Sequence, residues 1–347
     1  MLVEGLALQG QTPFGCAQGR LRFAQGDSTT PGKPSTGGQR RAYDAGVTKR
    51  GLLIVNPTAR GAPSMEKLRE AAGDLEGCET QLVATEGVGH ATELARDAAG
   101  RGLDAVVACG GDGTVNEVAN GLAGSATALA VVRGGTANVW AKEAGVPRKA
   151  AQALRLLTEG ETRTIDLGRA GDRLFVLMAG VGFDADIIRG LSGRWKRRLG
   201  AAAYVASGLR QAVTYRETEA ALRANGRVAP EHLYWLLIGN TRNYGGLLNL
   251  TYRAKVNDGR LDLCLLRRGG LHRLLWLLPW ALLKRHDRRP EVRYEQIGSL
   301  EIDSPGLPVQ LDGEYYRETP LRFEVAPAAL RVITPRGLKS PLFGDES

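Results

Sequence analysis

The stretch Ala108–Glu117, ACGGDGTVNE, places three glycines around one aspartate where a predicted strand is followed by a predicted helix. Residues 103–109 form the apolar run of a buried strand, and residues 115–122 carry an apolar stripe with helical spacing. In an open parallel sheet, ligands bind beyond the carboxyl ends of the strands, where the next helix exposes unpaired amides. We therefore expect an anion-binding site at this junction.

The glycines and the acid of this stretch indicate which anion would bind. Gly110, Gly111 and Gly113 let the backbone approach a ligand where a Cβ atom would collide, and Thr114 offers a hydroxyl at the helix start. Phosphate is the simplest such anion. Asp112 would repel it unless a divalent cation or a hydrogen bond lay between them, so the acid suggests Mg²⁺ nearby. A glycine turn in which Asp112 caps the helix is the structural alternative.

Further strand and helix patterns surround the glycine stretch. Residues 51–55, 81–84 and 128–132 form short apolar runs, and helical patterns cover 63–76 and 91–98. Repeated strand–helix units predict a parallel sheet with right-handed crossovers. The spacing matches neither the P-loop nor the dinucleotide fingerprint.

The second half of the chain has a different sequence pattern. Helical insertions are expected near 200–213 and 271–285, and Gly, Asn, Asp and Pro turns separate most of the strand-like runs. The pattern predicts an antiparallel β domain, and 347 residues with 43% hydrophobic content are enough for two cores. The expected strands are 165–167, 174–178, 233–238, 261–266, 300–302, 309–311 and 321–325.

The amino-terminal region and the cysteines carry no fold signal. Residues 1–49 are polar and rich in Gly, Ser, Thr and Pro, which predicts a disordered extension or an upstream mis-assigned start rather than a signal peptide. The four cysteines lie far apart without the spacing of a disulfide framework or a zinc site. A reducing cytoplasm fits this usage best.

The formal charge of +9 suits either nucleic acid or an anionic membrane. Residues 267–294 hold eight Lys or Arg against two acids and bracket the apolar run 274–283, which is too short to span a bilayer. This run is either a helix in the membrane interface or a buried helix kinked at Pro279. Residues 193–199 add a basic run around Trp195. No nucleic-acid recognition motif accompanies the charge, so we expect no nucleic-acid partner.

Short motifs in a fixed order lead to a family. They are Asn56-Pro57, Thr85 with Gly89-His90-Ala91, Gly110–Gly121, Gly135–Asn138, Gly182–Ala185, Asn240 with Tyr244-Gly245-Gly246, Asp258-Gly259 with Asp262, and Leu311–Glu314. Over residues 51–335 the chain resembles the diacylglycerol kinase catalytic family, which includes bacterial lipid kinases and sphingosine-kinase relatives. The resemblance implies an NAD kinase/diacylglycerol kinase-like two-domain fold, α/β plus β.

The resemblance also implies domain limits. A parallel-sheet α/β nucleotide-binding domain would cover 50–148, and an antiparallel β-sandwich lipid-substrate domain would cover 149–326. Residues 327–347 would return to the first domain.

The implied activity is an ATP-dependent lipid kinase that transfers the γ-phosphoryl group to a lipid hydroxyl, foremost diacylglycerol, which gives phosphatidic acid. A sphingoid base, ceramide or another lipid stays open as acceptor, because Val139-Trp140 stands where many members have an acid followed by an aromatic residue. An NAD kinase-like enzyme, a phosphofructokinase and an inactive lipid- or nucleotide-binding regulator are further alternatives. The expected location is the cytoplasm, in peripheral contact with the anionic inner face of the membrane, and a homodimer stays open.

The family's site residues fall on named positions of this chain. Asp312 would be the base, with Glu314 close by, although Asp312-Gly313 also fits a hairpin turn. The structural magnesium site would use the Asp258 carboxylate and the main-chain carbonyls of Lys255 and Arg260, or else be a turn without metal. ATP and Mg²⁺ are the implied cofactors. Nucleotide contacts carry over to Asn56, Thr85, Gly110, Gly111, Asp112, Gly113, Thr114, Val115, Asn116 and Thr136, although each threonine also fits a helix cap.

Overall fold

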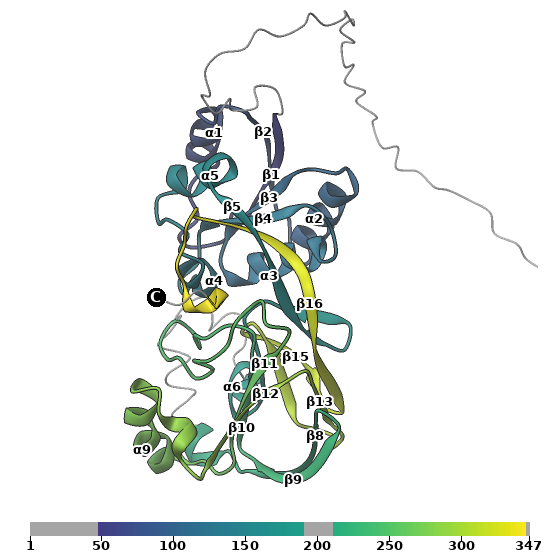
Figure 1. Cartoon of the computed structure of the whole chain (residues 1–347), viewed down its shortest axis with the longest axis vertical. Helices are drawn as coiled ribbons and strands as arrows, with labels where there is room; N and C mark the ends of the chain where they lie inside the picture. The colour runs from purple at the N-terminus through teal and green to yellow at the C-terminus, as the bar shows by residue number, and fades with distance from the viewer. Residues whose placement is uncertain (1–47, 191–210, 345–347) are drawn as a thin grey trace, which may run out of the picture. The chain divides into compact units, whose positions relative to one another are not determined.

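The computed structural model describes residues 48–190 and 211–344 of the chain. Figure 1 shows an α/β part, which contains α1 to α5, and a β part, which contains β8 to β15. Residues 1–47, the basic run 193–199 and most of the helical insertion expected at 200–213 lie outside the described residues. Only residues 211–213 of that insertion are described, and they are helical.

The α/β part is built on four parallel strands in the order β2, β1, β3 and β4, as the strand and helix patterns predict. Each strand is followed by a helix that covers a face of the sheet (Figure 1). The strands are β1 (Lys49–Val55), β2 (Cys78–Ala84), β3 (Ala105–Gly110) and β4 (Ala128–Arg133). The helices are α1 (Met65–Gly73), α2 (His90–Gly100), α3 (Asp112–Leu122), α4 (Val139–Glu143) and α5 (Ala150–Glu159).

One long strand, β16 (Leu321–Thr334), belongs to both parts, as Figure 1 shows. Near its end, Arg331 and Val332 pair in parallel with β4. Its first residues pair antiparallel with β13 (Ser299–Ile302), and much of its length pairs with β5 (Glu161–Ala170). The strand therefore extends the parallel sheet of the α/β part into the β part.

The β part is a sandwich of two sheets. One consists of the first half of β16 with β13, β8 (Thr218–Ala224), β9 (Arg227–Leu233), β5 and β6 (Arg173–Phe175). The other is six-stranded and runs in the order β12 (Val292–Ile297), β11 (Leu261–Leu266), β10 (Trp235–Gly239), β7 (Met178–Gly182), β14 (Pro308–Leu311) and β15 (Glu314–Glu318). The expected fold class, a parallel α/β sheet with an antiparallel β sandwich, is confirmed.

The two faces of the six-stranded sheet have different partners. Leu261, Leu263 and Leu265 alternate along β11 and join the core between the sheets. Cys264 and Leu266 point to the opposite face, where they share a cluster with residues of α9 (Leu271–Leu282). The inner face thus builds the sandwich, and the outer face meets a helix.

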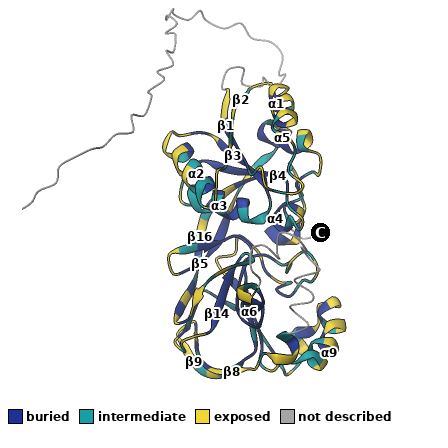
Figure 2. Ribbon diagram, turned by 180° about the vertical axis from the view of Figure 1, so that it is seen from behind, coloured by how far each residue is buried: buried dark blue, intermediate teal, exposed yellow. Residues whose placement is uncertain are grey.

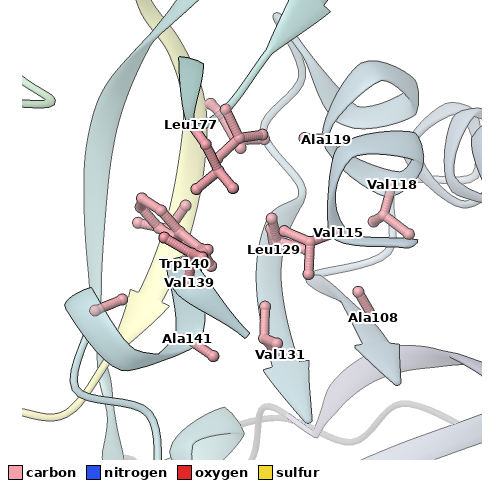
Figure 3. Packing of buried hydrophobic residues seen from close by; sticks show 14 of the residues in the cluster. Ala108, Val115, Val118, Ala119, Leu129, Val131, Val139, Trp140, Ala141 and Leu177 are labelled. Carbon is pink, nitrogen blue, oxygen red and sulfur yellow. The ribbon is translucent and has the colours of Figure 1, made fainter. Parts of the chain in front are cut away.

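Two further helical segments join this frame. Helix α6 (Phe183–Gly190) follows β7, and short 3₁₀ turns cover His286–Arg288 and Pro341–Phe343. In the α/β part, Val115 and Val118 of α3, Leu129 and Val131 of β4 and Trp140 of α4 gather in one apolar core (Figure 3). This core fixes the starts of α3 and α4 against the sheet.

Candidate active site

A cavity of about 230 Å³, which we call the polar cavity, lies where β1, β2 and β3 end. Its lining comes from the loops after β1 and β2, the first turns of α2 and α3, and one residue of β15 in the sandwich. The lining residues used below are Asn56, Thr85, Gly113, Thr114, Glu117 and Glu314.

Four of the predicted nucleotide contacts line this cavity, namely Asn56, Thr85, Gly113 and Thr114. Asn56 Nδ2 donates to Thr114 Oγ1 over 3.2 Å, so the loop after β1 is tied to the start of α3. The Thr85 N–H donates to the Val55 carbonyl over 2.8 Å, which brings the loop after β2 alongside. The first amides of a helix lack intrahelical partners and carry partial positive charge. The start of α3 therefore offers the cavity a site for an anion.

The structure requires glycine at these positions for different reasons. A Cβ on Gly110 would lie 2.4 Å from Thr114 Oγ1, and a Cβ on Gly135 would lie 2.6 Å from the Gly111 Cα. Gly110 therefore leaves room for the Thr114 side chain, and Gly111 and Gly135 allow the loops after β3 and β4 to touch. Neither Gly110 nor Gly111 lines the polar cavity. Gly113 does line it, and there a Cβ would meet only Glu314 Oε1, at 3.2 Å. Of these three glycines, only Gly113 is placed where a ligand in the cavity could approach the backbone.

Asp112 acts as a cap, although it caps α4 and not α3, the helix that it begins. Its Oδ1 accepts the N–H of Trp140, over 3.2 Å, at the start of α4. Burial raises the pKa of Asp112, and hydrogen bonds from the backbone of residues 138–140 oppose that rise. Asp112 is not part of the polar cavity lining, so its place does not support a role beside the phosphates.

Three other predicted nucleotide contacts are also directed elsewhere. The Val115 side chain is buried in the α/β core (Figure 3), and its N–H bonds to the Gly111 carbonyl over 3.1 Å. Asn116 is 3% exposed and its amide turns toward the sandwich. Thr136 is exposed in the loop after β4 and does not line the polar cavity. The sequence alone could not exclude Val115 and Asn116, because the residues of one helical turn point to different faces of the helix.

Asp312 and Gly313 form the two-residue turn between β14 and β15, with φ values of 49° and 86°. Positive φ at both positions is what a type I′ hairpin requires, so the hairpin prediction holds. The Asp312 carboxylate accepts three consecutive backbone N–H groups, residues 176–178, at 2.8 to 2.9 Å, and Asn116 Nδ2 at 2.7 Å. Burial raises the pKa of Asp312 to about 6, against these hydrogen bonds.

A carboxylate has about four acceptor positions, and these four hydrogen bonds occupy them. Asp312 therefore fastens the hairpin to the β6–β7 connection and to α3. This geometry does not favour Asp312 as the base.

Glu314, two residues further along the hairpin, has the opposite surroundings. Its Oε1 lies over the glycine turn at Gly113, and its Oε2 accepts from Arg173 Nη2 over 3.0 Å. The Glu314 side chain is 46% exposed and lines the polar cavity. Arg173 was not predicted, because an arginine after a turn carries no sequence signal for this role.

The remaining polar residues of α3 hold the site together. Glu117 accepts the N–H groups of Gly89 and Ala91 at 3.0 and 3.2 Å and so caps α2 from a neighbouring helix. Asn120 exchanges hydrogen bonds with Leu174 of β6, at 3.0 Å each. Much of the GGDGTVNEVANG motif is therefore structural.

The predicted magnesium site lies in the loop before β11. Asp258 is exposed, and its carboxylate accepts the Arg260 N–H at 3.0 Å and a longer hydrogen bond of 3.3 Å from Gln296. The Gly259 N–H donates to Asp166 Oδ2 over 2.7 Å, which fixes the loop. Among the described residues, no group of three or more His, Cys, Asp or Glu side chains is placed to hold a metal.

Metal binding at this loop would rest on one carboxylate and main-chain oxygens. Mg²⁺ is usually bound through one or two carboxylates while it keeps several waters. The accessible carboxylate of Asp258 on a fixed loop fits that donor set.

A second cavity, of about 310 Å³, lies between α9 and the outer face of the six-stranded sheet. We call it the apolar cavity. Apart from Cys264 and His286, aliphatic and aromatic side chains line it. Leu237 and Leu266 belong to the sheet side of the lining, and Leu274, Leu275, Leu278 and Ala281 belong to the α9 side.

Comparison with known proteins agrees with both parts of the fold. Residues 50–170 match the diacylglycerol kinase catalytic domain, and residues 178–334 match the YegS C-terminal NAD kinase beta sandwich-like domain. A diacylglycerol kinase of Bacillus subtilis is 30% identical over 294 residues, which cover 83% of this chain and 97% of that protein. A Pseudomonas putida protein described as a YegS-like lipid kinase is 37% identical over 80% of this chain and 92% of its own length.

A solved structure shows the same fold. The crystal structure of a diacylglycerol kinase from Bacillus anthracis superimposes with a TM-score of 0.69 at 24% identity, over 83% of this chain and 98% of that one. The chain belongs to the diacylglycerol kinase catalytic-domain family.

Proposed function

We propose that this protein transfers the γ-phosphoryl group of ATP to the hydroxyl of a membrane lipid, foremost diacylglycerol, and so produces phosphatidic acid. The observation that carries the proposal is the position of Glu314. Its carboxylate comes from the sandwich and lies over the glycine turn at the start of α3, inside the polar cavity. A carboxylate that faces a helix start able to hold phosphates suits phosphoryl transfer to an alcohol, because it can accept the proton of the attacking hydroxyl.

The polar cavity would hold the triphosphate. The amides of Gly113 and Thr114 and the side chains of Asn56 and Thr85 surround the space at the positive end of α3. Mg²⁺ on the phosphates would supply charge neutralisation. The residues of this chain contribute position, because few of them need to take part in covalent chemistry.

Glu314 would act as the base. Its carboxylate takes the proton of the lipid hydroxyl while the lipid oxygen bonds to the γ-phosphorus, the bond to the β,γ-bridging oxygen breaks, and ADP leaves. Arg173, 3.0 Å from Glu314, holds the carboxylate in place. Asp312 has a positioning role, because its hydrogen bonds set the start of the strand that carries Glu314.

The apolar cavity would accommodate an acyl chain of the acceptor lipid. Its lining is almost entirely apolar, which suits a hydrocarbon chain and does not suit a nucleotide or a sugar. The second magnesium site would be structural, with Asp258 and the carbonyls of Lys255 and Arg260 as ligands. Cys78, Cys109 and Cys264 are free thiols, which supports a location in the reducing cytoplasm.

A transfer assay with labelled ATP tests the function. The full chain would be offered diacylglycerol, sphingosine, ceramide and NAD separately, in detergent micelles with Mg²⁺, and the products identified by mass spectrometry. We expect phosphatidic acid from the wild type and little from Glu314→Gln. Transfer only to NAD would assign an NAD kinase-like activity, and ATP binding without transfer to any acceptor would assign a regulator.

A further inference from the structure

Helix α9 is apolar on nearly every side, yet the residues that the structure describes leave much of it exposed. Leu277 and Ala281 are buried, but Leu275 is 58%, Leu282 is 62% and the following Leu283 is 65% exposed. Figure 2 accordingly shows much of the α9 ribbon in the colours for exposed and intermediate residues. A helix that is apolar all round is normally buried in a protein core or in lipid. The exposed side of α9 therefore lacks a partner within the described residues.

Exposed apolar side chains concentrate around this helix. Of the ten large hydrophobic residues that are exposed in the described chain, five are in α9 or directly after it. Two more, Val213 at 59% and Leu247 at 80%, are sequence neighbours of residues that line the apolar cavity. We call this set the α9 surface: Val213, Leu247, Leu275, Trp276, Leu278, Leu282 and Leu283.

Basic residues follow the apolar helix. Lys284, Arg285 and Arg288 are exposed, and among the described residues no acidic side chain forms an ion pair with them. The Arg289 guanidinium lies over the ring of Trp276, 4.1 Å from its centroid, and 4.9 Å from that of Trp280. An apolar face bordered by cations and tryptophans is the pattern of helices that bind anionic lipid surfaces.

The same charges argue against a second copy of this chain as the partner. A twofold interface brings the same patch of both subunits together, so the cations of one copy would face those of the other. Anionic lipid headgroups would instead neutralise them, and each basic residue near such a surface contributes to binding.

We propose that the α9 surface docks on an anionic lipid bilayer and holds the mouth of the apolar cavity against it. Leu275 and Leu278 are exposed and also line that cavity, so the cavity opens on the docking face. A lipid chain passes from the bilayer into the cavity without crossing water. The entry of the acceptor rests on the proposed function, whereas docking itself does not.

The helix lies along the membrane and does not cross it. Its 12 residues correspond to about 18 Å, against about 30 Å of hydrocarbon. No helix in the described ranges is both long and apolar enough to pass through a bilayer.

Vesicle sedimentation without ATP tests the docking. The full chain would be mixed with phosphatidylcholine vesicles that contain either no anionic lipid or about a third phosphatidylglycerol, at low and at high salt. We expect binding to the anionic vesicles and weakening at high salt, where the Debye length falls to about 3 Å. Equal binding to both compositions at low salt would overturn the electrostatic part of the proposal.

Two variants locate the surface. Leu282→Glu/Leu283→Glu changes exposed residues outside the cavity lining, and we expect it to lower the partition coefficient at least about tenfold, because a charge replaces apolar area. The matched control is Val228→Glu, an exposed apolar residue on β9, which should bind as the wild type does. Lys284→Glu/Arg285→Glu/Arg288→Glu should lower binding to anionic vesicles by more than about tenfold, since each charge contributes about 1 kcal/mol.

The control for charge is Arg69→Glu/Arg96→Glu/Arg155→Glu, which makes the same change in net charge on exposed helix positions of the α/β part. If this control lost as much binding as the α9 variant, net charge and not the α9 surface would govern docking. Dimerisation that Leu282→Glu/Leu283→Glu abolishes, with no vesicle binding by the wild type, would assign the surface to a second copy.

Docking and catalysis fail separately in these assays. A protein that phosphorylates a lipid in micelles but does not sediment with vesicles would contradict the docking and leave the proposed function intact. A protein that docks through α9 but transfers no phosphoryl group to any lipid would contradict the proposed function and support the docking.

Discussion

The polar cavity and the apolar cavity are built by different means. Loop ends and the start of α3 form the polar cavity, and close glycine contacts pack the loops beside it, so each of these features depends on particular residues. Side chains of β strands and of α9 form the apolar cavity, and other aliphatic residues of similar volume would serve there. A reaction type can therefore be inferred from a sequence more readily than the lipid on which the enzyme acts.

Asp312 and Glu314 also differ in their surroundings. The two acids belong to one hairpin, but backbone amides enclose the first and the polar cavity contains the second. The first acid has a structural environment, and the second is the acid that we propose as the base. Substitutions that remove only the charge of each acid test this difference.

Glu314→Gln has the largest expected effect. It removes the proton acceptor and leaves the hairpin, so we expect kcat to fall by about 10²- to 10⁴-fold with an unchanged unfolding midpoint. Glu318→Gln is the matched control on the same strand, because Glu318 pairs with Arg189 and does not line the polar cavity. Glu314→Gln turnover within a few fold of the wild type would place the base elsewhere.

Asp312→Asn should act on stability first. The amide would turn a donor toward backbone N–H groups that now bind a carboxylate oxygen, which costs about 1–3 kcal/mol. Urea unfolding measures the loss, and activity should fall with it because the strand that carries Glu314 loses its anchor. A variant with wild-type stability and no turnover would instead return the base to Asp312.

Two glycines distinguish the packing of the loops from the binding of a ligand. Gly135→Ala forces a Cβ to within 2.6 Å of the Gly111 backbone, and we expect a loss of about 1–3 kcal/mol in the free energy of unfolding. Gly113→Ala meets only the end of the Glu314 side chain, so it should leave stability almost unchanged and raise the KM for ATP. Equal destabilisation by both variants would contradict the assignment.

Strong local patterns made much of the fold predictable. Apolar runs and the helical stripe after Val115 predicted the parallel strands and α3, and turn-separated runs predicted most of the sandwich. The β8–β9 hairpin was missed because residues 218–224 are rich in alanine and other helix formers. Asn225-Gly226, with φ values of 48° and 81°, is a hairpin signal that was present in the sequence.

The site was predictable only in part. The order of the motifs along the chain indicated that Asn56, Thr85 and Thr114 lie near one another, because the carboxyl ends of parallel strands meet at one edge of the sheet. Which face of the first turn of α3 meets the cavity depends on tertiary packing, so Val115 and Asn116 were included although they point elsewhere. Arg173 reaches Glu314 only through the sandwich, and no local pattern indicates that contact.

The apolar cavity should control chain length. Cys264→Phe places a larger side chain in its lining, and we expect several-fold higher KM for long-chain diacylglycerol with little change for a dioctanoyl substrate. The ratio of kcat/KM for the two substrates is the measurement. An equal loss for both chain lengths would point to general disruption of the sandwich.

A buried acid in the β part gives the smallest predicted effect. Asp184 is fully buried, with a hydrogen bond of 3.0 Å from Gln310, and burial raises its pKa to about 7. The native state keeps this proton between about pH 4 and 7 while the unfolded chain releases it, so stability falls as the pH rises through that range. Asp184→Asn should flatten the pH dependence of the free energy of unfolding, measured with urea between pH 4 and 7. If the variant kept a slope as steep as that of the wild type, other titratable groups would account for the pH dependence of stability.

The most direct measurement is a crystal structure of the protein with Mg²⁺ and a non-hydrolysable ATP analogue. The account predicts the terminal phosphates within hydrogen-bond distance of the Gly113 and Thr114 amides, with the Glu314 carboxylate facing the γ-phosphate from the sandwich side. An analogue bound away from the start of α3, or a Glu314 carboxylate turned away from the γ-phosphate, would contradict it.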